Sequence, residues 1–192
     1  MDTATLHRRT VETWTDRLNG VDADQWDTRT PCTEWSVRDL VNHVVGEERW
    51  TVPLMQGRTI EDVGDSLSGD LLGDDPARSA AEAAREAVAV VEDRLPSGGK
   101  VQLSYGEEDM DEYVRQLATD HLIHAWDLAA ATSGSTVLDP ELVDEVARWF
   151  ADRERLYREG GAIGARGRSA GDPQSELLAA FGRSVTWIPG PR

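Results

Sequence analysis

The sequence feature that most constrains the fold is an apolar seam between residues 110 and 131. Its members alternate spacings of four and three residues over three heptads, as one face of a long helix does. They are Met110, Val114, Leu117, His121, His124, Leu128 and Ala131. The seam therefore predicts a helix over residues 109–132 that packs against other helices, with two histidines inside its apolar face.

Helix start signals divide the rest of the chain. Ser36 is a predicted N-cap with Asp39 three residues later, and a stripe of Val and Leu continues to about Met55. The pair Asp75-Pro76 predicts the start of a helix that ends near residue 95. A helix over residues 3–19 completes a set of four main helices.

Two further helices are predicted near the C-terminus. One begins at Asp139-Pro140 and carries apolar residues as far as Tyr157, and a short one runs from Asp172-Pro173 to Phe181. Residues 22–34 and 160–171 are expected to be loops. Residues 56–75 form a long connection, which in a compact domain is often functional or a crossover.

Strand patterns are nearly absent from the sequence. Only residues 101–105 could form a short extended piece, and no segment alternates apolar and polar residues over a longer distance. The predicted fold is all-α, a four-helix bundle with a long crossover connection and a short C-terminal helix. A length of 192 residues suits one domain, which we expect to span 1–192.

The composition excludes several classes of protein. The chain carries 36 Asp and Glu against 20 Lys and Arg, a formal net charge of −16, which repels nucleic-acid phosphates and anionic membranes. A single cysteine, Cys32, excludes an intramolecular disulfide and a four-cysteine zinc site. No secretory signal or membrane-length apolar segment is visible, so we expect a cytoplasmic protein.

The histidines offer one metal-binding pattern. Asp120 and His124 are four residues apart, which places them one turn apart on the same helix face. His43 lies on the flank of the Val stripe, one turn before Glu47, and could face that pair in a bundle. The alternative is that these are core or surface side chains with ordinary hydrogen bonds. His7 has no evident partner, and we expect it to be exposed.

Two segments resemble one known family. Residues 30–43 read TPCTEWSVRDLVNH and residues 120–129 read DHLIHAWDLA. Both resemble motifs of actinobacterial metal-binding proteins related to the N-terminal domain of mycothiol-dependent maleylpyruvate isomerase, within the DinB-like superfamily. A weaker match covers residues 177–183 and Trp187.

The resemblance implies a divalent metal bound by His43, Asp120 and His124. Zinc is the metal expected first, with nickel or another divalent ion as alternatives. The isomerase has Glu where this chain has Asp120, and Asp is shorter by one methylene. The resemblance therefore implies that the shorter Asp120 carboxylate reaches the metal through a water.

The activity implied is S-transfer. A three-residue site leaves an open position, where a metal can favour the thiolate of mycothiol or a related thiol for attack on a small electrophile. His121 and Asp127 are candidates to orient the ligands, and Trp126 and Glu47 to line a pocket. Cys32 is interpreted as a buried structural thiol, with a place near the metal as the alternative.

Other activities stay open at this stage. The chain has no room for the isomerase's additional C-terminal domain, so we expect maleylpyruvate not to be its substrate. A non-catalytic metal-binding or interaction module and a metal-assisted hydrolase are the alternatives. The expected partners are a small-molecule thiol and an electrophile, without nucleic acid or membrane, and the chain is expected to be a monomer or homodimer.

Overall fold

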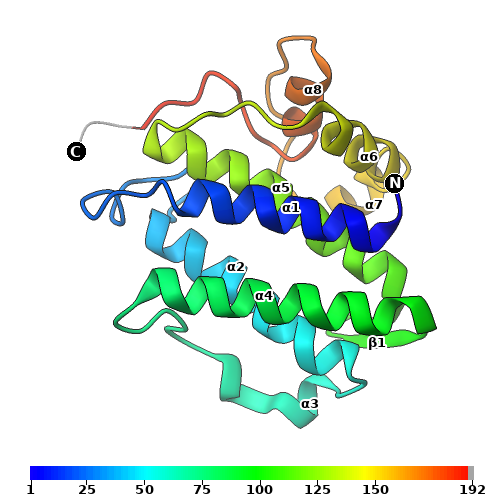
Figure 1. The fold of residues 1–192 in the computed structure, drawn as a ribbon. Helices are drawn as coiled ribbons and strands as arrows, with labels where there is room; N and C mark the ends of the chain where they lie inside the picture. Colours follow the sequence, from blue (N-terminus) through cyan, green and yellow to red (C-terminus); the bar gives the residue numbers. More distant parts are fainter. Residues whose placement is uncertain (190–192) are drawn as a thin grey trace.

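The architecture was determined from a computed structural model, which describes residues 1–189 (Figure 1). The long helices are α1 (Thr3–Leu18), α2 (Val37–Met55), α4 (Pro76–Arg94) and α5 (Met110–Thr132). Helix α1 packs against α5 and α4, and α2 packs against α4 and α5. The predicted all-α bundle is confirmed, and within residues 1–189 none of the helices is long and apolar enough to cross a membrane.

The helices begin where the sequence places caps. Ser36 accepts a hydrogen bond from the Asp39 backbone, and the Asp39 side chain accepts one from the Ser36 backbone, which completes a capping box. Asp75 caps α4 with Pro76 at its first position, and the Asp172 side chain caps the short helix α8 (Pro173–Ala180). Such caps are each worth about 1 kcal/mol and fix the register of the buried helix faces.

The long connection between α2 and α4 runs back along the outside of the bundle, from the end of α2 to the start of α4 (Figure 1). It contains α3 (Ile60–Val63) and the 3₁₀ turn η1 (Gly64–Leu67). The Asn42 amide donates to the carbonyl oxygen of Gly69 at 3.0 Å, and its oxygen accepts from the Leu71 backbone at 2.8 Å. These hydrogen bonds hold the connection against α2 at Asn42, the residue before the predicted metal ligand His43.

A β-hairpin precedes α5. The turn η2 (Leu95–Ser97) leads into β1 (Lys100–Leu103), which pairs antiparallel with β2 (Gly106–Asp109). The sequence predicted one extended piece over 101–105. The second strand was missed because its acidic residues lack the apolar alternation by which strands are recognised.

The C-terminal segment packs on α5. Helix α6 (Pro140–Phe150) is followed by a separate α7 (Glu154–Glu159), so the prediction of one helix through Tyr157 was wrong. The break has a tertiary cause: Arg153 donates to Glu112 of α5 at 2.7 Å and to the Trp149 carbonyl oxygen at 2.7 Å. A local pattern could not reveal the contact with Glu112, which is 41 residues away in sequence.

One histidine departs from expectation. His7 is only 1% exposed, whereas the sequence analysis expected a surface position. It lies on the buried face of α1 together with Val11, Trp14 and Leu18, at spacings of four, three and four. The same periodicity was present in the sequence and indicated burial.

Candidate metal centre and pocket

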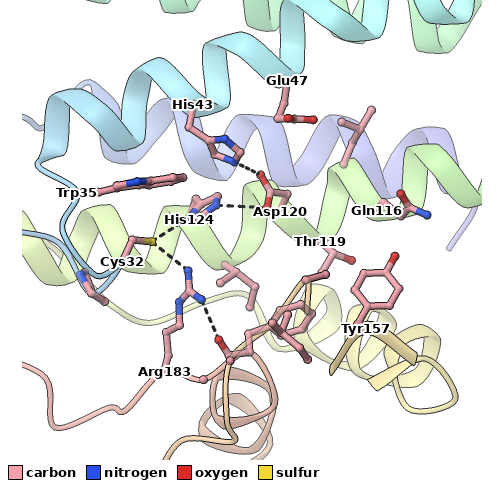
Figure 2. A pocket seen from close by; sticks show the side chains of 18 of the residues that line it. Cys32, Trp35, His43, Glu47, Gln116, Thr119, Asp120, His124, Tyr157 and Arg183 are labelled. Carbon is pink, nitrogen blue, oxygen red and sulfur yellow. Dashed lines mark hydrogen bonds and ion pairs between the residues drawn. The ribbon is translucent and has the colours of Figure 1, made fainter. Parts of the chain in front are cut away.

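Three side chains from two helices meet at one wall of a pocket. His43 Nε2 of α2 lies 3.2 Å from Asp120 Oδ2 of α5, and His124 Nε2 lies 3.3 Å from Asp120 Oδ1 (Figure 2). Asp120 and His124 share a face because four residues make about one helical turn. The structure therefore brings together the three residues that the resemblance names.

The donor atoms suit a divalent ion. One ligand atom from each of the three residues lies within 4.8 Å of the others. Ligands with bonds of about 2.0–2.1 Å to a tetrahedral zinc lie about 3.3 Å from one another, close to the spacings observed here. The side chains of His43 and Asp120 keep 31% and 37% of their surface exposed, so the group opens on the pocket.

The electrostatics of the group are coupled. Burial lowers the pKa of His124, but the Asp120 carboxylate and the hydrogen bonds of Asp120 and Asp127 outweigh burial and hold it well above 6.5. Burial raises the pKa of Asp120, and the imidazoles of His124 and His43 outweigh that effect and keep it well below 3.8. Asp120 is therefore an anion near neutral pH, as a metal ligand must be.

A buried carboxylate fixes the orientation of His124. His124 Nδ1 lies 2.9 Å from Asp127 Oδ2, and Asp127 is fully buried. Arg183 donates to Asp127 Oδ2 at 2.7 Å and to Oδ1 at 3.1 Å. Since Asp127 accepts the proton of Nδ1, the other ring nitrogen of His124, Nε2, faces Asp120, which accepts the Nε2 proton at 3.3 Å. A metal would replace that Nε2 proton, and a carboxylate behind Nδ1 is the usual arrangement behind a metal-binding histidine.

Cys32 lies beside this support. Its Sγ is 3.1 Å from Arg183 Nη2, 3.3 Å from Asp127 Oδ2 and 3.8 Å from His124 Nδ1. Cys32, His124 and Asp127 form a second group with metal-ligand spacing. The guanidinium of Arg183 already neutralises this group, so the cluster of His43, Asp120 and His124 is the better place for a cation.

The loop before α2 holds the Trp35 ring against the histidine cluster. The Thr30 backbone donates to the carbonyl oxygen of Trp35 at 3.0 Å, and the Trp35 backbone donates to that of Cys32 at 3.1 Å. The Trp35 ring centroid lies 4.9 Å from that of His43 and 6.2 Å from that of His124. Trp35 thus covers one end of the histidine cluster, as Figure 2 shows.

Glu47 follows His43 by one turn of α2 and lines the same pocket. Burial raises the pKa of Glu47 and the neighbouring Asp120 carboxylate raises it further, while the nearby imidazoles lower it. Its pKa stays above the ordinary value of 4.5. A carboxylate with a raised pKa is a stronger proton acceptor than an exposed glutamate.

The pocket has a volume of about 740 Å³. The cluster and Trp35 form one side, and aromatic side chains of the C-terminal segment form the other (Figure 2). The contributions of Tyr157 and Trp149 could not be predicted from sequence, because the positions of these rings depend on how the C-terminal segment packs on α5. Arg183 lay within the weaker motif, but nothing in the sequence indicated its bond to Asp127.

Two other candidates lie outside the pocket. Trp126 is 2% exposed and packs in the core between α5, α6 and α8. His121 turns away from the cluster: its Nε2 lies 3.2 Å from Glu48 Oε1, and its Nδ1 bonds the Leu117 carbonyl oxygen at 2.7 Å. The His7 ring meets it edge-on, at 5.7 Å between centroids.

Three comparisons relate this chain to known proteins. Residues 7–129 match the family model of the mycothiol maleylpyruvate isomerase N-terminal domain. An uncharacterized protein of Mycobacterium tuberculosis, in strains CDC 1551 and H37Rv, is 35% identical over 204 residues that cover 96% of this chain and 100% of that protein. A crystal structure of a histidine-to-alanine mutant of the mycothiol-dependent maleylpyruvate isomerase has a similar fold, with a TM-score of 0.65 and 15% identity over 82% of this chain and 71% of that one.

Proposed function

This chain belongs to the mycothiol maleylpyruvate isomerase N-terminal domain family, and from that premise we propose that it is a divalent-metal-dependent enzyme. It activates a low-molecular-weight thiol such as mycothiol and transfers the sulfur to a small electrophile. Zinc is the metal proposed first. The observation that carries the proposal is the convergence of His43, Asp120 and His124 on one open side of a pocket.

Each residue has a separate role in this proposal. His43, Asp120 and His124 hold the metal, and Asp127 keeps His124 in the orientation that this requires. A bound divalent ion supplies the Lewis acidity that favours a thiolate over a thiol at neutral pH. Glu47 is the carboxylate placed to accept the thiol proton, and Trp35 shields the cluster from solvent on one side.

The reaction balances in simple terms. The thiol loses its proton, and the sulfur lone pair forms a bond to an electrophilic carbon. That carbon releases a leaving group or, in an addition, the adduct takes up a proton. The pocket contributes by holding the two molecules side by side, which by itself accelerates a bimolecular step.

The test combines elemental analysis with a thiol-transfer assay. The purified protein, its Asp120→Asn variant and a matched Asp111→Asn variant are compared. Asp111 lies on the same helix but is exposed and pairs with Arg115. We expect Asp120→Asn to weaken metal binding by more than about 100-fold, since losing an outer partner of a ligand alone costs about 10–100-fold.

The assay follows consumption of mycothiol with a model electrophile. We expect transfer to disappear with the metal in Asp120→Asn and in His43→Ala, and to be retained in Asp111→Asn. Transfer that survives complete loss of the metal would refute the metal-dependent mechanism. Bound metal without thiol-dependent turnover would instead support a binding module, and turnover that needs only water would support a hydrolase.

A further inference from the structure

The side of the pocket opposite the histidine cluster is an apolar wall. It is built from α5, from α6 and α7, and from the segments around α8. Its members are Leu117, Ile123, Trp149, Tyr157, Ile163 and Phe181. A pocket of about 740 Å³ has room for the reacting ends of two small molecules, one at the cluster and one at this wall.

The aromatic part of the wall is already ordered. The Tyr157 ring meets Trp149 edge-on with 6.2 Å between centroids, and it meets Phe150 in the same way at 5.4 Å. Phe181 stacks on Phe150 at 4.1 Å. These contacts fix the rings against one another. A flat apolar ligand therefore binds a preformed surface, and little free energy is lost in ordering the side chains of the wall.

The charges around the wall disfavour an anion. Arg183 is the only guanidinium among the described residues that line the pocket, and Asp127 binds it through both carboxylate oxygens. The guanidinium of Arg153, next along from the wall, is bound in the same way by Glu112. Two carboxylates, Glu47 and Asp120, also line the pocket. The imidazole of His124 is paired with Asp120 at 3.3 Å and with Asp127 at 2.9 Å, so it is not an unpaired cation either.

A metal at the cluster would not change this balance. The two charges of a divalent ion held by His43, Asp120 and His124 would be offset by the Asp120 carboxylate and by the thiol in its anionic form. An anionic second molecule would therefore lose its hydration without gaining an unpaired cation, which is costly. An uncharged ring would bury apolar surface against the wall instead.

We propose that this apolar wall binds the electrophile and that the electrophile is an uncharged aromatic molecule rather than a carboxylate. The inference rests on the proposed thiol transfer, since it assigns the second substrate of that reaction. It makes Ile163, Tyr157 and Phe181 residues that determine specificity.

The first experiment measures binding without turnover. The probes are methyl 3,5-dinitrobenzoate and 3,5-dinitrobenzoate, which share one ring and differ by the charge of the carboxylate. Isothermal titration calorimetry on the full chain is done with a chelator, so that no divalent ion at the cluster can bind the carboxylate of the acid. We expect the ester to bind at least about tenfold more tightly than the acid, because the acid buries an unpaired charge. Equal affinity, tighter binding of the acid, or no binding of either probe would overturn the proposal.

Two variants of Ile163 test whether the preference for the ester over the acid arises at the apolar wall. Ile163 lies on the loop after α7 and is only half-buried, so it tolerates a polar side chain. Ile163→Arg adds an unpaired cation to the wall and is expected to shift the preference toward the acid by at least about tenfold. The uncharged control Ile163→Gln should weaken ester binding without favouring the acid. An unchanged preference in Ile163→Arg, with the far-ultraviolet circular dichroism of the native protein, would contradict binding at this wall.

Turnover tests the proposed function separately. With mycothiol and methyl 4-chloro-3,5-dinitrobenzoate, the sulfur forms a bond to the ring carbon, the carbon–chlorine bond breaks, chloride leaves and the thiol proton is released. The free acid is the matched probe, and each catalysed rate is divided by its own uncatalysed rate. If the ester binds selectively but neither probe is transferred, thiol transfer is refuted and the apolar site is not. If transfer favours the acid, the assignment of the wall is refuted and thiol transfer is not.

Discussion

His7 should make the stability of this protein depend on pH. Burial, and then the nearby His121, lower the pKa of His7 from 6.5 to about 3. Neither ring nitrogen has a hydrogen-bond partner among the residues that the structure describes. The folded protein therefore keeps this ring neutral at pH values where the unfolded chain protonates it.

The sign and size of the effect follow from the two pKa values. Because the folded-state pKa lies below the unfolded one, the unfolded state binds more protons, and stability falls as the pH drops below 6.5. At pH 5 the chain is about 1.5 pH units below the unfolded pKa and still above the folded one. At about 1.36 kcal/mol per unit, His7 alone should remove about 2 kcal/mol of stability between pH 8 and pH 5.

The assay compares the wild type with His7→Leu by guanidinium chloride unfolding at pH 8 and pH 5, in the presence of a chelator. Leucine has nearly the volume of histidine and does not titrate. The variant should lose about 2 kcal/mol less than the wild type over this interval. Other titrating groups cancel in the comparison, and so does any constant offset at pH 8.

The control is Arg8→Leu, because Arg8 is the exposed neighbour of His7 and receives the same new side chain outside the core. It should retain the pH dependence of the wild type. If His7→Leu and the wild type lose the same stability to within about 0.5 kcal/mol, the usual limit of additivity, then His7 does not titrate as its burial requires.

Three further outcomes follow from contacts around the site. Arg183→Met should weaken metal binding by about 10–100-fold in a chelator competition, because Asp127 then loses the partner that orients it toward His124. The control Arg155→Met, at the exposed end of α7, should leave metal binding unchanged. Cys32→Ser should leave the metal content by elemental analysis unchanged, since Arg183 and not a metal neutralises the group around Sγ; loss of metal would place Cys32 among the ligands. Ser36→Ala should lower the unfolding free energy by about 1 kcal/mol through loss of the capping box, and an unchanged denaturant midpoint would show that the cap is not formed in solution.

The main helices could be predicted from sequence because their signals are local. Ser36, Asp75 and Asp172 form caps with their own neighbours in the chain, and the heptad seam of α5 repeats within one helix. The features that could not be predicted from sequence depend on contacts between residues far apart in the chain. The break before α7 depends on Arg153 reaching Glu112, which is 41 residues away in sequence.

The candidate site also combines residues that local sequence patterns predict with residues that only tertiary contacts reveal. The pair of Asp120 and His124 follows from helical spacing. His43 was a candidate from its place on the flank of the Val stripe, and the resemblance to a family then named it as a ligand. The support from Arg183 could not be predicted, because it joins residues 56 positions apart in sequence. His121 carried the same signal as His124, a histidine in an apolar seam, yet its ring faces Glu48 in a separate buried pair. Only the direction of the side chain distinguishes the two.

The aromatic part of the apolar wall and the histidine cluster come from different parts of the chain. The family model spans residues 7–129, which include His43, Asp120, His124 and Asp127. The aromatic wall, from Trp149 to Phe181, follows that range and reaches the pocket by packing on α5. Residues that face the electrophile can therefore change without disturbing the donor atoms on α2 and α5. The mycothiol-dependent maleylpyruvate isomerase has a similar fold, so under our proposal a difference in the second substrate would come from this wall and not from the helices that carry the cluster.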